Sequence, residues 1–185
     1  MKTIKIILLL LFISSSLIAQ KINIDITFYT KNLEAYKGTW VYQSNDTIFR
    51  IVLQKAQKIE SYYTIDGLLG GYFLSVKGDT LENYLSPLPT YWKSSTKPNN
   101  LYIWATNYSL NKQDVDPNSL RFIFWDQRKK HYNSNGIMAG TINLLSPNKI
   151  QWILDEVEGI RATIDQTADP IGFSVPTDVI MIKEE

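Results

Sequence analysis

Few side chains in this chain of 185 residues have the chemistry needed for catalysis or metal binding. The sequence contains no cysteine and a single histidine. Without cysteine there is no thiol nucleophile, thiolate metal site or disulfide, and one histidine cannot build the His-rich sites that zinc favours. These classes of function are therefore excluded.

One polar segment has the spacing that begins a calcium-binding loop. Asp114, Asp116 and Asn118 alternate along the chain, and side-chain oxygens at alternate positions can converge on one cation. An EF-hand needs Gly and Glu at the positions where this chain has Ser119 and Trp125. The segment is therefore better explained as a polar turn, and we expect no metal site.

A second acidic group follows a predicted strand. Asp155, Glu156 and Glu158 are candidates for the pair of carboxyl groups that glycoside hydrolysis uses. His131 is a conceivable base, because two neighbouring lysines disfavour its protonation. However, the sequence has no Gly-x-Ser-x-Gly elbow, phosphate-binding glycine loop or dinucleotide fingerprint. We therefore expect solvated acids, a surface histidine, no catalytic residue and no cofactor.

Aromatic side chains are better candidates for binding. Tyr91 and Trp92 form an exposed-looking pair in a proline-containing loop, where aromatics supply contact area at low entropic cost. The alternative is that these rings fold back over a barrel mouth. Trp104, Trp125 and Trp152 lie on separate predicted strands, where they either line a cavity or fill the core. The candidate ligand-binding residues are therefore Tyr91, Trp92, Trp104 and Trp152.

The beginning of the chain has the pattern of a secretory signal peptide. Two lysines precede an unbroken apolar run from Ile6 to Ile13, and small residues follow. The run is far shorter than the ~20 residues of a membrane-spanning helix. We expect cleavage near Ala19, which makes residues 1–19 a signal peptide and residues 20–185 a single domain. The protein is then expected to be periplasmic or extracellular.

Beyond this segment, apolar and polar residues alternate with the period of two that is typical of β-strands. No segment shows the spacing of about 3.6 residues that predicts a globular helix. The pattern favours an all-β fold of about ten strands, either a sandwich or a closed barrel. The alternation is clear at residues 21–28, 47–53, 120–126 and 177–183.

Four other segments are expected to shape the sheet. Residues 32–37 are predicted to form a single helical turn before a strand. Residues 66–71 contain three glycines and are predicted to form the turn of a hairpin. Residues 86–100 and 157–176 are irregular, and we expect them to be surface loops that carry any recognition.

The segment Lys37-Gly38-Thr39-Trp40 resembles the Gly-x-Trp signature of lipocalins, in which the tryptophan closes one end of a barrel. Nearly the whole mature chain is similar to an uncharacterised family of exported lipocalin-like proteins from Gram-negative bacteria. The resemblance implies an antiparallel, calycin-type barrel of about 8 to 10 strands with a short N-terminal helical turn. It implies no functional residues. The similar segments are Ala19–Gln20, Gly38–Trp40, Ser146–Trp152 and Phe173–Asp178.

Three functions are compatible with these features. The first is a barrel that holds a small apolar or amphipathic ligand in its interior, as the resemblance implies. The second is a solid barrel whose long loops recognise a protein or a glycan. The third is an exported hydrolase, for which no convergent acid and base are evident. The formal net charge of +1 lacks the basic excess of a nucleic-acid-binding surface, and we expect a monomer.

Overall fold

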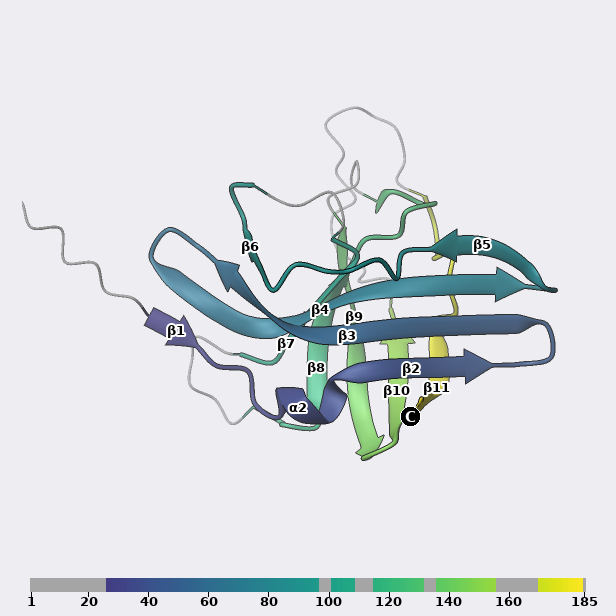
Figure 1. The fold of residues 1–185 in the computed structure, drawn as a ribbon, viewed down its shortest axis with the longest axis horizontal. Helices are drawn as coiled ribbons and strands as arrows, with labels where there is room; N and C mark the ends of the chain where they lie inside the picture. Colours follow the sequence, from purple (N-terminus) through teal and green to yellow (C-terminus); the bar gives the residue numbers. More distant parts are fainter. Residues whose placement is uncertain (1–25, 97–100, 109–114, 132–135, 156–169, 185) are drawn as a thin grey trace, which may run out of the picture.

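The computed structural model describes residues 26–96, 101–108, 115–131, 136–155 and 170–184 (Figure 1). Eight strands form a closed antiparallel barrel, to which further short strands are added. The predicted all-β barrel is therefore confirmed, and the sandwich alternative is excluded.

The barrel strands follow one another in sequence order, and the last pairs with the first. Closure depends on β11, which pairs with β2 through Ile182–Val41 and Lys183–Trp40. Closure removes the exposed sheet edges that favour aggregation. The strands are β2 (Gly38–Gln43), β3 (Thr47–Ile59), β4 (Tyr63–Val76), β7 (Ile103–Thr106), β8 (Ser119–Phe124), β9 (Ile137–Ser146), β10 (Lys149–Leu154) and β11 (Asp178–Lys183).

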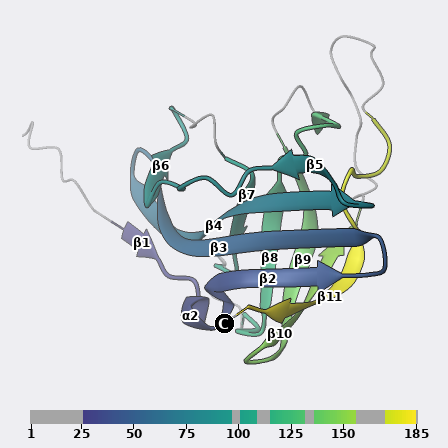
Figure 2. The same cartoon turned by 45° about the vertical axis from the view of Figure 1, so that its right-hand side comes forward.

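The β3–β4 hairpin is longer than the barrel needs, and short elements flank its extension (Figures 1 and 2). Strand β1 (Ile26–Phe28) lies parallel to β4, and β6 (Tyr91–Lys93) lies parallel to β3. Strand β5 (Asp79–Asn83) pairs with the last residues of β4. The predicted helical turn is present as α2 (Leu33–Tyr36). In the described part of the chain, no helix has the length and apolar character needed to cross a membrane.

The hairpin turn predicted at the three glycines is wrong, because β4 runs through them without a break. Close packing is what requires glycine here. A Cβ atom at Gly67 would lie 2.7 Å from the ring of Trp104, and one at Gly71 would overlap the carbonyl oxygen of Tyr84. The chain turns instead at residues 60–62.

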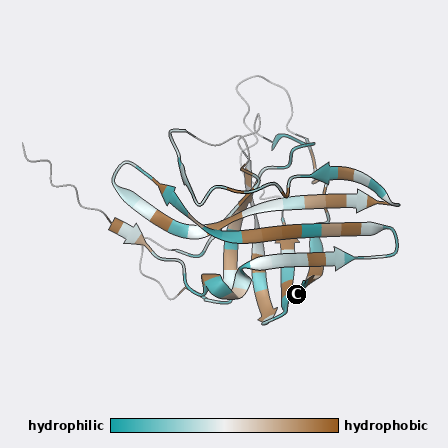
Figure 3. Cartoon of the chain, in the orientation of Figure 1, coloured by the Kyte–Doolittle hydropathy of each residue, from teal (hydrophilic) through white to brown (hydrophobic). Residues whose placement is uncertain are grey.

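Large side chains fill the barrel interior. Trp152 stacks on Phe122 with ring centroids 4.2 Å apart. Phe49 and Phe124 meet Trp152 edge to face at 5.6 and 5.9 Å. All four side chains are fully buried, and apolar residues recur along the long strands (Figure 3). At this level the barrel has a solid aromatic core.

The helical turn α2 covers one end of the barrel, where Trp40 is fully buried as predicted. Its indole N–H donates a hydrogen bond of 2.8 Å to the carbonyl oxygen of Tyr36. The ammonium of Lys183 lies 5.0 Å from the centre of the Trp40 ring. Gly38, with φ +130°, permits this approach, because a Cβ atom there would lie 2.8 Å from Cε of Lys183.

Candidate functional site

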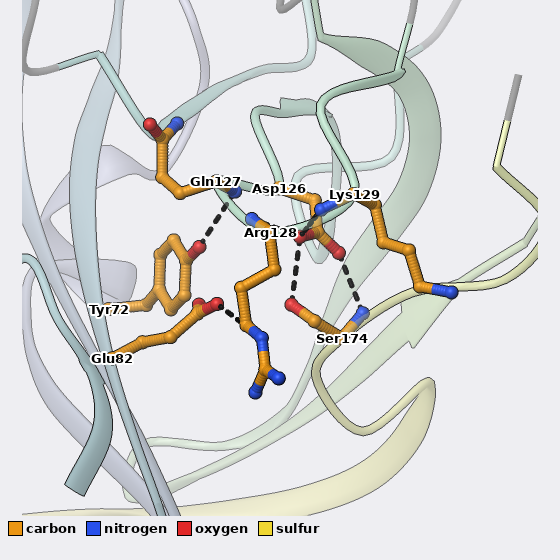
Figure 4. Close-up of polar contacts among 7 residues, drawn as sticks. All are labelled: Tyr72, Glu82, Asp126, Gln127, Arg128, Lys129 and Ser174. Carbon is orange, nitrogen blue, oxygen red and sulfur yellow. Dashed lines mark hydrogen bonds and ion pairs between the residues drawn. The ribbon is translucent and has the colours of Figure 1, made fainter.

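A group of polar side chains, here termed the end cluster, occupies the other end of the barrel (Figure 4). Strand β4 runs in the same direction as β2, so its last residues and β5 lie at the end opposite to α2. The turn after β8 and the segment before β11 complete the site. The members are Tyr72, Glu82, Asp126, Gln127, Arg128, Lys129 and Ser174.

Asp126 ties the segment before β11 to the turn after β8. Its carboxylate accepts hydrogen bonds from the backbone N–H groups of Arg128 at 3.0 Å and Lys129 at 2.9 Å. It also accepts bonds from the N–H and hydroxyl of Ser174 at 2.7 and 2.8 Å. These four bonds satisfy a side chain that is almost fully buried. These hydrogen bonds therefore give the buried Asp126 carboxylate a structural role.

Glu82 is equally buried but differs in its partners. Within the described residues, neither oxygen of its carboxylate accepts a hydrogen bond. The Nε atom of Arg128 lies 3.7 Å from Oε1, which is an ion pair longer than a hydrogen bond. Burial raises the pKa of Glu82, and the charge of Asp126 adds to this rise. The hydroxyls of Tyr72 and Ser174 and the charge of Arg128 oppose it.

Aromatic rings pack against one another beside the polar side chains of the end cluster. The Tyr72 hydroxyl accepts a hydrogen bond of 3.1 Å from the N–H of Gln127, and burial raises the pKa of this tyrosine. Its ring lies 5.1 Å from that of Tyr84 and 5.2 Å from that of Phe124. Tyr84 in turn stacks on Tyr102 at 4.8 Å.

His131 lies beneath the segment before β11, so the prediction of a surface histidine is wrong. It is 3% exposed. Its Nε2 lies 3.0 Å from the carbonyl oxygen of Gly172, and its ring lies 5.2 Å from that of Phe173. The turn that Asp126 stabilises directs this side chain inward, whereas the basic neighbours Arg128 and Lys130 are exposed.

Only one of the three candidate catalytic acids lies within the described residues. Asp155 is exposed directly after β10, and Glu156 and Glu158 lie outside the described residues. Their relative geometry therefore adds nothing to the hydrolase hypothesis.

The segment with calcium-like spacing contains a local polar turn. The carboxylate of Asp116 accepts a hydrogen bond of 2.8 Å from the N–H of Asn118, while Asp114 lies outside the described residues. Among the residues that the structure describes, no group of three His, Cys, Asp or Glu is placed to hold a metal ion.

The four aromatic candidates are not brought together. Trp152 lies in the barrel interior, whereas Trp92 and Trp104 belong to a second apolar core outside the barrel and meet edge to face at 5.5 Å. Trp92 is only 7% exposed, so its predicted exposure is wrong. Residues 91–93 form a strand inside the segment 86–100, so the prediction of a wholly irregular loop there is wrong. In a strand, neighbouring side chains point to opposite faces, and Tyr91 is 57% exposed.

Tyr91 lines a surface groove of about 400 Å³, here termed the outer groove, on the extension of the β3–β4 hairpin. Tyr91 pairs with Gln57 of β3, and Gln57 pairs with Asp66 of β4. Paired residues on neighbouring strands lie on the same face, and Nε2 of Gln57 donates to Oδ1 of Asp66 at 3.0 Å. The three side chains therefore form a row across β6, β3 and β4. Leu33 and Lys55 also line the groove.

Comparison with known proteins assigns the sequence to a family but gives no activity. Residues 1–184 match the sequence profile of a family described as a family of unknown function (DUF6705). Neither a curated protein nor a solved structure matches the chain. The function therefore has to be argued from the fold and its surface.

Proposed function

The chain belongs to this family of unknown function, and from its surface we propose that it is a non-catalytic binding protein that recognises a saccharide in the outer groove. The observation that carries the proposal is the row formed across three paired strands by exposed Tyr91, exposed Gln57 and half-buried Asp66. The row combines an aromatic ring with an amide and a carboxylate, which is a mixed apolar and polar binding surface.

The barrel interior is less suited to hold a ligand. Trp152 and Phe122 stack there, and both are fully buried among other aromatic rings. Protein interiors are close-packed, so a ligand at this level would have to displace those rings. This packing favours the hypothesis of a solid barrel with recognition on its outside.

The chemistry of the outer groove fits a sugar. Neighbouring strands lie about 4.8 Å apart, so a row of three side chains spans roughly 10 Å, the scale of a short oligosaccharide. An exposed tyrosine ring covers the apolar face of a ligand, while amide and carboxylate groups hydrogen-bond its hydroxyls. At the rim, Lys55 forms an ion pair of 2.5 Å with Glu34, which adds charged groups of both signs.

Binding without turnover is proposed because both acids near the groove are engaged, and Glu34 at the rim is paired with Lys55. Asp66 is the one carboxylate in the row, and it already accepts a hydrogen bond from Gln57. Glycoside hydrolysis typically uses two carboxyl groups about 5 to 10 Å apart. We also place the protein outside the cytoplasm, on the basis of the signal-like residues 1–19.

An oligosaccharide array tests this function. The wild type is compared with Tyr91→Ala, and Tyr29→Ala is the matched control because Tyr29 is 73% exposed and lies outside the groove lining. We expect Tyr91→Ala to weaken binding by at least about tenfold, as loss of an aromatic anchor does, and Tyr29→Ala to leave it unchanged.

Fatty acids and hydrophobic dyes are screened in parallel to test the interior alternative. A ligand whose binding changes with Trp152→Phe but not with Tyr91→Ala would place the site inside the barrel. Absence of any saccharide ligand, or equal binding by Tyr91→Ala and the wild type, would contradict the proposal.

A further inference from the structure

One carboxylate of the end cluster lacks the partners that a buried anion requires. The Glu82 side chain is 1% exposed. Within the described residues no hydrogen bond of good geometry reaches either oxygen, and the hydroxyls of Tyr72 and Ser174, which act to lower the pKa of Glu82, are its nearest donors besides Arg128. A buried charge is destabilising unless it is paired and hydrogen-bonded. Such groups are found preferentially at functional sites.

The cation paired with Glu82 is loosely held. Arg128 extends from the turn after β8 (Figure 4), and its side chain is 53% exposed. Its Nε atom is 3.7 Å from the carboxylate. A long ion pair with one exposed partner contributes little to stability, so its displacement would cost little.

Tyrosine rings lie beside this carboxylate. Tyr84 follows Glu82 by two residues, and its backbone N–H donates a hydrogen bond of 2.8 Å to the carbonyl oxygen of Tyr72. Burial and then the charge of Glu82 raise the pKa of Tyr84. Tyr84 packs on Tyr72 at 5.1 Å and on Tyr102 at 4.8 Å. Aromatic faces carry negative partial charge and attract cations.

We infer that this end of the barrel binds an organic ammonium group between the Glu82 carboxylate and the tyrosine rings, with Arg128 as the internal cation that the ligand displaces. An ammonium in place of Arg128 donates hydrogen bonds to the Glu82 carboxylate oxygens and contacts the rings at the same time. This site is distinct from the outer groove and does not depend on it.

A metal ion fits the same residues less well. Calcium takes about six to eight oxygen ligands. The described residues contain no group of three potential metal-ligating side chains, and the oxygens of Asp126 already accept four hydrogen bonds. An anion would be repelled by the Glu82 carboxylate.

The test is a titration of the ¹⁵N-labelled protein with n-butylammonium, with n-butanol as the neutral analogue of equal length. The amide signals of Gln127 and Ser174 report on the end cluster. Arg128→Gln removes the internal competitor, and we expect it to bind n-butylammonium several-fold more tightly than the wild type. Glu82→Gln should abolish the response. Lys130→Gln makes the same charge change nearby and should bind as the wild type does.

Each variant gives a decisive outcome. Equal affinity of the wild type and Arg128→Gln, or an undiminished response of Glu82→Gln, would overturn the inference, as would an equal response to n-butanol. If Glu82→Gln does not fold, the comparison of Arg128→Gln with Lys130→Gln still decides, because both positions are exposed. Tyr91→Ala should leave this titration unchanged, which separates this site from the outer groove.

Discussion

At the residue scale, two carboxylates with similar burial have opposite effects on the stability of the fold. Asp126 accepts four hydrogen bonds, two of them from Ser174, which is 48 residues away in sequence. Glu82 faces one long ion pair. Hydrogen bonding to the charged form favours that form, whereas burial without it favours the neutral form. The same side-chain chemistry therefore stabilises the fold at one position and weakens it at the other.

We predict that Glu82→Gln stabilises the protein at neutral pH by roughly 1 kcal/mol, the scale on which unsatisfied buried groups act. Because burial raises the pKa of Glu82 above its ordinary value of 4.5, the folded state holds the proton more tightly than the unfolded state. Its contribution to stability is therefore present at pH values below 4.5 and is lost as pH rises through the folded pKa. Urea denaturation at several pH values between 4 and 8 measures this, and the variant should show a flatter pH profile.

Asp126→Asn is the matched control, because an amide cannot accept all four of the bonds that this carboxylate accepts. It should lower stability at neutral pH. A Glu82→Gln variant that is less stable than the wild type at pH 7 would mean that the ion pair with Arg128 outweighs desolvation.

At the element scale, the strands with regular alternation were predictable and the strand buried on both faces was not. Residues 47–53 and 120–126 alternate because one face points into the barrel and the other outward. In β4, Leu68 and Leu69 are adjacent and both fully buried, one in the barrel core and the other in the second core. With both faces covered, alternation disappears, and the glycines required by close packing resemble a turn.

The residues of the two candidate sites were likewise only partly predictable from the sequence. Tyr91 could be identified from the sequence because an aromatic residue in a polar loop is a local signal. Gln57 and Asp66 join it only through the cross-strand register of β6, β3 and β4. Glu82 and Asp126 likewise meet through tertiary packing, and no spacing in the sequence predicts that contact.

The continuity of β4 leads to a prediction at Gly71. Gly71→Ala should destabilise the fold by about 3 kcal/mol, the upper part of the range for overpacking, because its Cβ would overlap the backbone at Tyr84. Gly78→Asn is the control, since no atom lies within 4 Å of a Cβ there and asparagine tolerates its φ of +87°. Thermal unfolding followed by circular dichroism measures both variants. Equal melting temperatures would show that the segment after Tyr84 does not pack against β4.

At the scale of the whole molecule, the barrel is closed differently at its two ends. The α2 end is closed by Trp40 and its hydrogen bond to Tyr36. The other end is closed by polar contacts that join β5, the turn after β8 and the segment before β11. The outer groove adjoins the α2 end, on the hairpin extension between α2 and β6, and lies away from the end cluster. A rigid barrel therefore separates the two proposed sites, and variants at one should not affect binding at the other.

The signal-like first residues predict that the chain is processed during export. In a Gram-negative host, we expect mass spectrometry of the periplasmic fraction to show a protein that lacks about its first 19 residues, as a cleaved signal peptide predicts. The double substitution Leu9→Arg and Leu10→Arg interrupts the apolar run and should leave full-length protein in the cytoplasm, whereas Lys2→Arg keeps the charge and should be processed normally. Because the chain has no cysteine, the melting temperature of the exported product should be the same with and without a reducing agent. An exported molecule that retains Met1 would contradict the signal-peptide assignment.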